Sequence, residues 1–180
     1  MVKGPRHAPE PGPEDAGAGS AGGLLVFAAD GVDLHQLERI GRWFARIVRG
    51  GDLILLEGPL GAGKTALVRA IARGLEVTDP VRSPSFTIAN VYRGRRLTVN
   101  HLDLYRLELI LDEDVLALED YVAPDAVTLV EWPEAGLERL GEADYAVKLE
   151  HQTVDTRRLE VIAGTAEAAA RWDSAEEAEA

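Results

Sequence analysis

Residues 57–65 read EGPLGAGKT, and this stretch decides the fold class of the chain. It fits the pattern G-x-x-x-x-G-K-[ST], with Gly58, Gly63, Lys64 and Thr65 at the defining positions. Glycines at such positions let the backbone curl so that successive N–H groups point at one phosphate. The helix that follows presents its positive dipole end to the same anion. In this pattern the lysine reaches the β- and γ-phosphates of a nucleotide, and the threonine hydroxyl can ligate Mg²⁺.

A glycine-rich turn between a strand and a helix would explain the same glycines, so the flanking residues matter. Residues 52–57, DLILLE, are a continuous apolar run of strand length, as expected for a buried parallel strand. Residues 64–75, KTALVRAIARGL, predict a helix that ends near Gly74. This is the context that the phosphate motif requires, so we expect a nucleotide-binding loop. The chain lacks the N/T-K-x-D segment of GTPases, which favours ATP over GTP.

The rest of the chain predicts one mixed α/β domain with a tail at each end. Residues 1–22 are rich in Pro, Gly, Ala and Glu and almost lack large apolar side chains, so we expect disorder. Residues 23–164 are expected to form the domain, and residues 165–180 an acidic tail, the last dozen or so of which could also form a frayed helix. The further elements predicted are a strand at 24–29, a helix at 33–48 with Asp33 as N-cap, a hairpin around Gly94, a short acidic helix at 112–122, a buried strand at 126–132 and a second hairpin within 145–164.

Composition narrows the class and location of the protein. A length of 180 residues suits one domain with a real core. No apolar run reaches the roughly 18 residues that a membrane span needs. The start of the chain has no apolar segment typical of a secretory signal and cysteines are absent, so we expect a cytoplasmic protein. The formal net charge of −12 disfavours direct nucleic-acid binding by this chain alone.

Nucleotide hydrolysis also needs a carboxylate near Mg²⁺ and a group that positions water. Asp103 follows the alternating run LTVNHL, and Glu131 follows the apolar run VTLV, so both are expected at strand ends. An ordinary solvent-exposed acid would explain either one, because 31 of the 180 residues are Asp or Glu. Glu131 fits better, since it ends a buried strand and precedes Trp132. That tryptophan either walls the nucleotide or belongs to the core.

A loop rich in hydroxyls and three histidines complete the candidates. Residues 82–87, RSPSFT, follow the phosphate-loop helix, where loops often sense the γ-phosphate, although a plain Ser-Pro turn would explain them too. His101 lies on a predicted strand and is interpreted as structural. His35 and His151 lack the spacing of metal ligands.

Four motifs in order resemble one known family: GPLGAGKT at 58–65, RSPSFT at 82–87, HLDLYRL at 101–107 and LVEWPE at 129–134. They closely resemble the bacterial TsaE family, over roughly residues 24–163. The resemblance implies an α/β P-loop NTPase fold, with a mixed, mainly parallel central sheet flanked by helices. It also implies a weak ATPase required for tRNA N6-threonylcarbamoyladenosine formation. That ATPase would act with the proteins TsaB and TsaD to reset the transferase complex, the partners would hold the tRNA, and no membrane would be involved.

The resemblance further implies roles for individual residues. Lys64, Asp103 and Glu131 would be catalytic, and Thr65, Asp103 and Glu131 would hold Mg²⁺ beside ATP. The stretch from Ser85 to Thr87 would be a switch-like loop, and the acidic helix would match the family's acidic segment. The residues expected to contact the nucleotide are Gly58, Pro59, Leu60, Gly61, Ala62, Gly63, Lys64, Thr65, Ala66, Thr87 and Trp132.

Two other classes of protein remain as alternatives. A free-standing small-molecule kinase would share the phosphate loop and would need a basic lid, for which YRGRR at 92–96 is the arginine-dense candidate. A nucleotide-gated binding module would use ATP only to order a protein interface. Stimulation of ATP turnover by a small acceptor would favour the kinase, and Glu131→Ala would separate the binding module from a hydrolysis-driven subunit.

Overall fold

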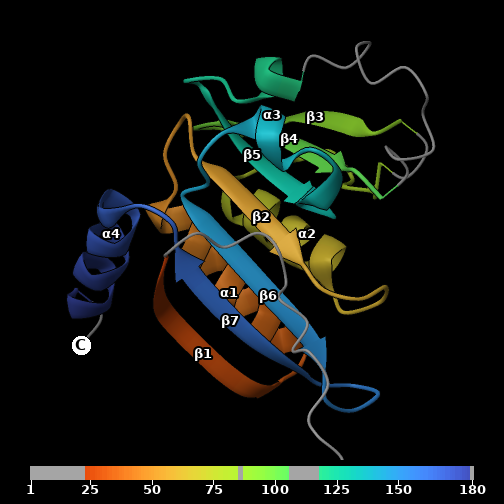
Figure 1. The fold of residues 1–180 in the computed structure, drawn as a ribbon, viewed down its shortest axis with the longest axis vertical. Helices are drawn as coiled ribbons and strands as arrows, with labels where there is room; N and C mark the ends of the chain where they lie inside the picture. Colours follow the sequence, from red (N-terminus) through yellow and green to blue (C-terminus); the bar gives the residue numbers. More distant parts are fainter. Residues whose placement is uncertain (1–22, 85–86, 106–117, 179–180) are drawn as a thin grey trace, which may run out of the picture.

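The computed structural model describes residues 23–84, 87–105 and 118–178. Its strands form one seven-stranded sheet in the order β1-β7-β6-β2-β5-β4-β3 (Figure 1). No helix within the described ranges is long and apolar enough to span a membrane. Along the chain the elements are β1 (Leu24–Val32), α1 (Leu34–Ile47), β2 (Leu53–Glu57), α2 (Lys64–Gly74), β3 (Ala89–Arg93), β4 (Thr98–Asp103), η3 (Leu118–Tyr121), β5 (Ala126–Glu131), η4 (Pro133–Ala135), α3 (Leu137–Leu140), β6 (Tyr145–His151), β7 (Arg157–Ala163) and α4 (Ala166–Glu177).

The sheet is mixed, as predicted, and its parallel part lies in the middle. Strand β2 pairs in parallel with β5 and β6, and β4 pairs in parallel with β5. The remaining pairings, β3 with β4, β7 with β6 and β1 with β7, are antiparallel, so the two kinds are equally frequent. The carboxyl ends of β2, β5 and β4 meet at one edge of the sheet, which is where open α/β sheets bind ligands.

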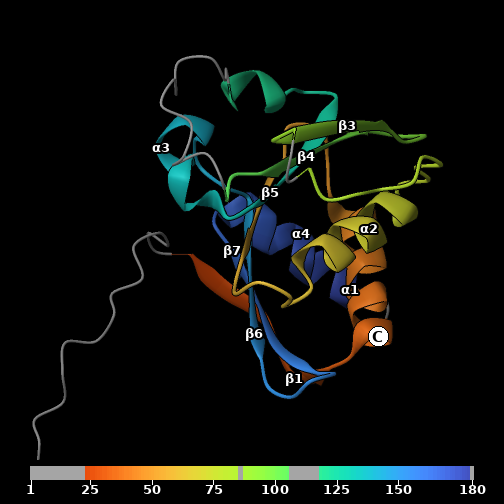
Figure 2. The ribbon, with the colours of Figure 1, turned by 90° about the vertical axis from the view of Figure 1, so that its right-hand side faces the viewer.

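Side-chain alternation along β2 divides the core into two layers. Ile54 and Leu56 belong to the larger apolar cluster, which α1, α2 and α4 cover. Leu53 and Leu55 belong to the smaller cluster, which η3 and α3 cover. Figure 2 shows α1 and α2 side by side on one face of the sheet and α3 on the other. Because both faces are covered, β2 is apolar throughout, which explains the run DLILLE.

Most of the predicted elements are confirmed. Helix α1 begins with a capping box: Asp33 accepts the N–H of Gln36 at 2.7 Å, and the Gln36 side chain accepts the N–H of Asp33 at 2.9 Å. Both hairpins form, and the first strand continues to Val32. Of the predicted acidic helix, residues 112–117 lie outside the described part, and Leu118–Tyr121 is a 3₁₀ helix.

The C-terminal segment differs from the predicted acidic tail, because residues 166–177 form α4. Thr165 caps this helix by accepting the N–H of Ala168 at 3.1 Å. Trp172 is only 2% exposed, and its ring centroid lies 5.7 Å from those of Trp43 and Phe44. The acidic composition hides an inner face made of small alanines and one tryptophan. Helix α4 therefore belongs to the folded domain, whereas the predicted tail at 1–22 lies outside the described residues.

Candidate nucleotide-binding site

The glycine loop between β2 and α2 has a backbone that only glycine adopts readily. Gly58, Gly61 and Gly63 have φ angles of 133°, 79° and 109°. A Cβ atom on Gly58 would lie 2.1 Å from the carbonyl oxygen of Leu149, and one on Gly63 would lie 3.2 Å from the Leu37 side chain. The pattern glycines are thus required by both conformation and space, as a phosphate cradle at the start of a helix demands.

Lys64, the first residue of α2, lies folded over the loop. Its Nζ donates to the carbonyl oxygens of Gly58 at 2.5 Å and Pro59 at 3.0 Å, and it lies 3.7 Å from the ring centroid of Trp132. Only 4% of Lys64 is exposed. Burial lowers the pKa of this ammonium, and the charges of Glu131 and Asp103 oppose that shift. The cation is thus held close to the two predicted acids.

Sheet register brings those two acids together. Asp103 ends β4 and stands beside Glu131, which ends β5, and Glu131 in turn stands beside Leu56 of β2. Both carboxylates are buried, and the Oγ1 of Thr65 donates to Oε1 of Glu131 at 2.7 Å. Alternation along β5 places Leu129 and Glu131 on the face that α2 covers. Residues from three elements therefore converge at the start of α2.

The donor set fits Mg²⁺, which prefers a few carboxylate or hydroxyl oxygens together with substrate phosphates. Thr65, Asp103 and Glu131 supply oxygen donors beside the glycine cradle. Among the described residues, no group of three or more His, Cys, Asp or Glu side chains forms a metal site by itself. A metal here would therefore depend on the threonine hydroxyl and on phosphate oxygens for part of its coordination.

His101 belongs to this site, although the sequence interpretation made it merely structural. Its Nε2 lies 2.8 Å from Oε1 of Glu131, the same oxygen that Thr65 contacts, and its side chain is fully buried. Its Nδ1 has no hydrogen-bond partner in the described part of the chain. The sequence did contain a signal for this position: His101 is two residues before Asp103, and residues two apart in a strand lie on the same face, here of β4.

The end of the β6–β7 hairpin also borders the loop, which no sequence pattern indicated. Arg157 is 6% exposed and donates from Nη1 to the carbonyl oxygen of Val32 at 3.1 Å. Its buried Nε has no partner among the described residues and lies 3.7 Å from the position of a Cβ on Gly63. His151 lies 3.1 Å through Nε2 from the carbonyl oxygen of Leu60. A buried cationic donor therefore stands beside the phosphate cradle.

The predicted switch loop is only partly described, since residues 85–86 lie outside the described ranges. Ser83 donates to Oδ2 of Asp103 at 3.1 Å, so a hydroxyl of this loop does reach the acid. The Thr87 hydroxyl instead donates to Oδ1 of Asn90 at 3.1 Å, and its contact with a nucleotide stays a prediction. Ile88 has a φ of 66°, a strained conformation for a β-branched residue.

Trp132 also has a left-handed backbone, with φ 55° and ψ 58°. Its ring covers Lys64 and lies 5.0 Å, between centroids, from the ring of Tyr105. Trp132 therefore forms part of the wall around the lysine rather than part of the two apolar clusters. Its role as a direct nucleotide contact stays a prediction.

Comparison with known proteins gives one consistent family. The family "Threonylcarbamoyl adenosine biosynthesis protein TsaE" matches residues 32–159. The tRNA threonylcarbamoyladenosine biosynthesis protein TsaE of Synechocystis is 44% identical, over 57% of this chain and 67% of its own. The protein of the same name from Streptomyces coelicolor is 37% identical, over 78% and 96% respectively. The crystal structure of Bacillus subtilis YdiB superposes with a TM-score of 0.72 at 27% identity, covering 86% of this chain and 96% of YdiB.

Proposed function

This chain belongs to the TsaE family of threonylcarbamoyl adenosine biosynthesis proteins, and from that premise we propose that it is the ATP-hydrolysing subunit of a tRNA-modifying complex. It binds ATP with Mg²⁺ in the cytoplasm and acts with the proteins TsaB and TsaD in forming N6-threonylcarbamoyladenosine. Hydrolysis resets the transferase complex between turnovers. The relatives' names support the pathway, and the geometry around the glycine loop supports ATP as the ligand.

One observation carries the ATPase proposal: Thr65 and His101 both contact Oε1 of Glu131, whose charge also acts on the buried ammonium of Lys64. Bound Mg²⁺ would neutralise charge on the phosphates. Lys64 and the loop N–H groups would bind and orient the phosphates, and the Thr65 hydroxyl would be one of the groups that hold the metal. Glu131, which His101 contacts, would position the attacking water.

The Asp103 carboxylate connects the site to the 82–87 loop through Ser83. The negative charge of a γ-phosphate would attract Lys64 and repel Asp103, so we expect the contact between Ser83 and Asp103 to depend on whether that phosphate is present. Ile88 follows the same loop and has a strained backbone, and a second conformation of the loop would relieve that strain. Loss of the γ-phosphate then relaxes this loop, and with it the interface for the partner proteins.

The structure disfavours the kinase alternative. Its proposed lid, YRGRR, forms the turn between β3 and β4, and Gly94 packs against the carbonyl oxygen of Leu75 just after α2. The glycine loop lies at the other end of α2, about 16 Å away for an 11-residue helix. Arginines in this turn therefore cannot close over donor phosphates.

The test is the rate of ATP hydrolysis by the protein alone and with purified TsaB and TsaD. We expect a low rate alone, stimulation by the pair, and loss of the stimulated rate in Glu131→Ala. Stimulation by a small acceptor instead of the pair would indicate a kinase. If Glu131→Ala still supports repeated cycles of tRNA modification, the binding-module alternative replaces the proposal.

A further inference from the structure

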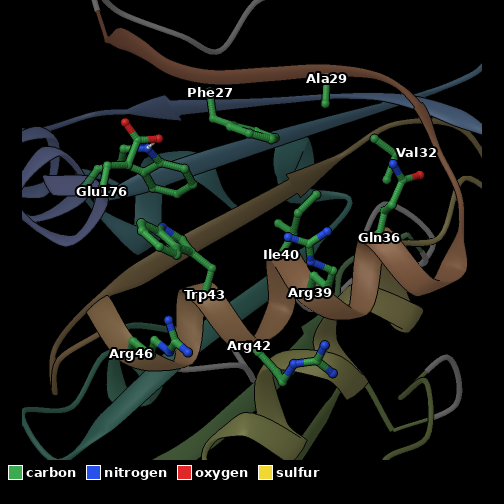
Figure 3. A pocket seen from close by; sticks show the side chains of 11 residues that line it. Phe27, Ala29, Val32, Gln36, Arg39, Ile40, Arg42, Trp43, Arg46 and Glu176 are labelled. Carbon is green, nitrogen blue, oxygen red and sulfur yellow. Dashed lines mark hydrogen bonds between the residues drawn. The ribbon is translucent and has the colours of Figure 1, made fainter. Parts of the chain in front are cut away.

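An open groove of about 670 Å³ separates β1 from α1 on the face of the sheet that α1 and α4 cover. Figure 3 shows Phe27 and Ala29 of β1 along one side, Arg39, Trp43 and Arg46 of α1 along the other, and Glu176 of α4 at one end. This groove lies away from the acids of the nucleotide site, which end β4 and β5. Nothing in the proposed ATPase cycle uses it.

The groove has a rigid aromatic wall. Trp172 is buried behind it, and its ring centroid lies 5.7 Å from that of Trp43 and 5.9 Å from that of Phe27. Trp43 and Phe27 are partly exposed, so their rings form the surface that a ligand would meet. Because both rings contact Trp172, which also lines the groove, they are held in place and can meet a ligand at little cost in side-chain entropy.

Helix α1, which lines the groove, is rich in basic side chains, although the chain as a whole is acidic. Residues 34–49 contain four arginines and one glutamate, while the chain carries a formal net charge of −12. Arg39, Arg42 and Arg46 all line the groove, at helical spacings of three and four. Within the described residues, Arg39 and Arg42 form no ion pair, whereas Arg49 pairs with Glu167 at 2.7 Å. Net charge thus conceals a local basic surface.

Arginines beside stacked aromatic rings suit single-stranded RNA, whose bases stack on rings while cations follow the phosphates. We propose that the α1–β1 groove binds an unstacked nucleotide of an RNA strand, with its base against Trp43 and Phe27 and the flanking phosphates against Arg39 and Arg42. This inference rests on the proposed function in tRNA modification. It revises the expectation that partners alone hold the tRNA.

Two features favour RNA over an acidic protein segment. The apolar wall consists mainly of aromatic faces, which match a base better than aliphatic side chains. Glu176 lies at one end of the groove and accepts a hydrogen bond from Nε1 of Trp172 at 3.1 Å. Its carboxylate repels anionic groups at that end, so the phosphates of a ligand are expected on the side of the arginines. A base at the Glu176 end and phosphates at the Arg39 end satisfy both constraints.

The test is fluorescence anisotropy of a labelled single-stranded oligoadenylate RNA, and of an anticodon stem–loop RNA, titrated with the full chain. Arg39→Ala/Arg42→Ala should weaken binding and lower the slope of log affinity against log salt by about 1.4, because each phosphate that an arginine neutralises contributes about 0.7 to that slope. Trp43→Leu should weaken binding about tenfold, as expected for one base stacked on a ring. Glu176→Gln should strengthen it.

A double variant that removes the same charge elsewhere, Arg139→Ala/Arg158→Ala, is the matched control and should bind like the wild type. Equal weakening by the control variant would show non-specific attraction and overturn the inference. Competition by a polyglutamate peptide as strong as that by unlabelled RNA of equal charge would also overturn it, in favour of an acidic protein partner. Competition by AMP as strong as that by RNA would assign the groove to free nucleotides instead.

ATP hydrolysis stimulated by TsaB and TsaD, measured on the same variants, separates this inference from the proposed function. Arg39→Ala/Arg42→Ala should keep that rate, because neither arginine contacts the glycine loop. If the wild type hydrolyses ATP with the pair but binds no RNA in the groove, the inference fails and the function stands. If the wild type shows no stimulated hydrolysis, the proposed function fails whatever the RNA result.

Discussion

Two buried ionic clusters lie at opposite ends of β2, and they are built differently. At the amino end, Arg171 donates to both oxygens of Asp52, at 2.7 and 3.1 Å, and to Asp144 at 3.4 Å. At the carboxyl end, Lys64 lies among Glu131, Asp103 and Glu134. Nε of Arg171 in the first cluster and Nδ1 of His101, which contacts Glu131 in the second, are both buried without a partner among the described residues, so unpaired nitrogens do not distinguish the clusters. The two clusters differ in the groups to which their cations donate hydrogen bonds.

The Arg171 cluster is a bidentate pair that completes itself. The backbone N–H of Arg49 donates to Oδ2 of Asp52 at 2.9 Å, the oxygen that Nη1 of Arg171 also contacts, and the N–H of Leu53 donates to the remaining oxygen of Asp144 at 3.1 Å. In the Lys64 cluster one ammonium faces three carboxylates, but its hydrogen bonds within the described residues go to the carbonyl oxygens of Gly58 and Pro59. The Arg171 cluster also has two carboxylates for one guanidinium, but there the cation donates directly to both. We therefore interpret the Arg171 cluster as a structural contact and expect the Lys64 cluster to bind a ligand.

The largest effect on stability is expected from a substitution that breaks the Arg171 cluster. Arg171→Leu leaves Asp52 buried without its cation and should lower the free energy of unfolding by about 3–5 kcal/mol. Urea denaturation followed by circular dichroism measures this change. Arg158→Leu, which removes a half-exposed arginine of β7 whose ion pairs with Asp30 and Glu160 are screened by water, should change the midpoint little. A midpoint for Arg171→Leu equal to that of the wild type would contradict the structural role.

The next largest effect, on ATP binding, is expected when the cation of the Lys64 cluster is removed. Lys64→Met should weaken ATP binding by about 2–3 kcal/mol, because charge-assisted hydrogen bonds to phosphate are removed. Burial lowers the pKa of Lys64, and such a lysine costs the folded state stability as the pH falls below its ordinary pKa. At neutral pH the variant should therefore melt no lower than the wild type. A fall in the melting temperature, measured by calorimetry, would show that Lys64 stabilises the fold.

A smaller effect tests how His101 holds Glu131. His101→Phe keeps the buried volume but removes the contact to Glu131, so kcat with TsaB and TsaD should fall about tenfold while KM for ATP changes little. His101→Gln can restore a donor at this position and should recover much of the rate. Steady-state kinetics on both variants, with melting temperatures as control, give the answer. Equal losses in the two variants would point to packing rather than positioning.

The smallest effect compares a buried pair with an exposed one. Arg49 and Glu167 lie 2.7 Å apart but are 63% and 71% exposed, so water screens their attraction. A double-mutant cycle with Arg49→Ala and Glu167→Ala should give a coupling energy below about 0.5 kcal/mol in the free energy of unfolding. A coupling energy several times larger would mean that the Arg171 cluster extends to the surface.

The sequence predicts the local elements of this fold well, because local rules determine them. The run DLILLE, the glycine loop and the two hairpin patterns carry their own signals, and each is confirmed. Helix α4 could be expected only as a frayed helix or a tail, because its inner face is made of alanines, which give little periodic signal, and one tryptophan. Its place in the core depends on Trp43, Phe44 and Tyr145, which lie far away in the sequence.

In the candidate site, too, some residues are predictable from local sequence and others only from the three-dimensional fold. Lys64, Thr65 and the glycines lie in one motif, and Asp103 and Glu131 each end a strand with a clear pattern. The roles of His101 and Arg157 depend on which strands become neighbours, since β4 lies beside β5 and β7 brings Arg157 to Gly63. That information is in the sheet order and not in any single stretch of sequence.

The most direct test of the central claim is a calorimetric titration with ATP, with and without Mg²⁺, on the wild type and on Glu131→Gln. The excess carboxylate charge around Lys64 predicts that the wild type binds ATP more tightly with Mg²⁺ than without it. Removing one of these charges with Glu131→Gln should reduce that dependence. ATP affinity that ignores Mg²⁺ in both proteins would contradict the assignment of this cluster as the nucleotide and metal site.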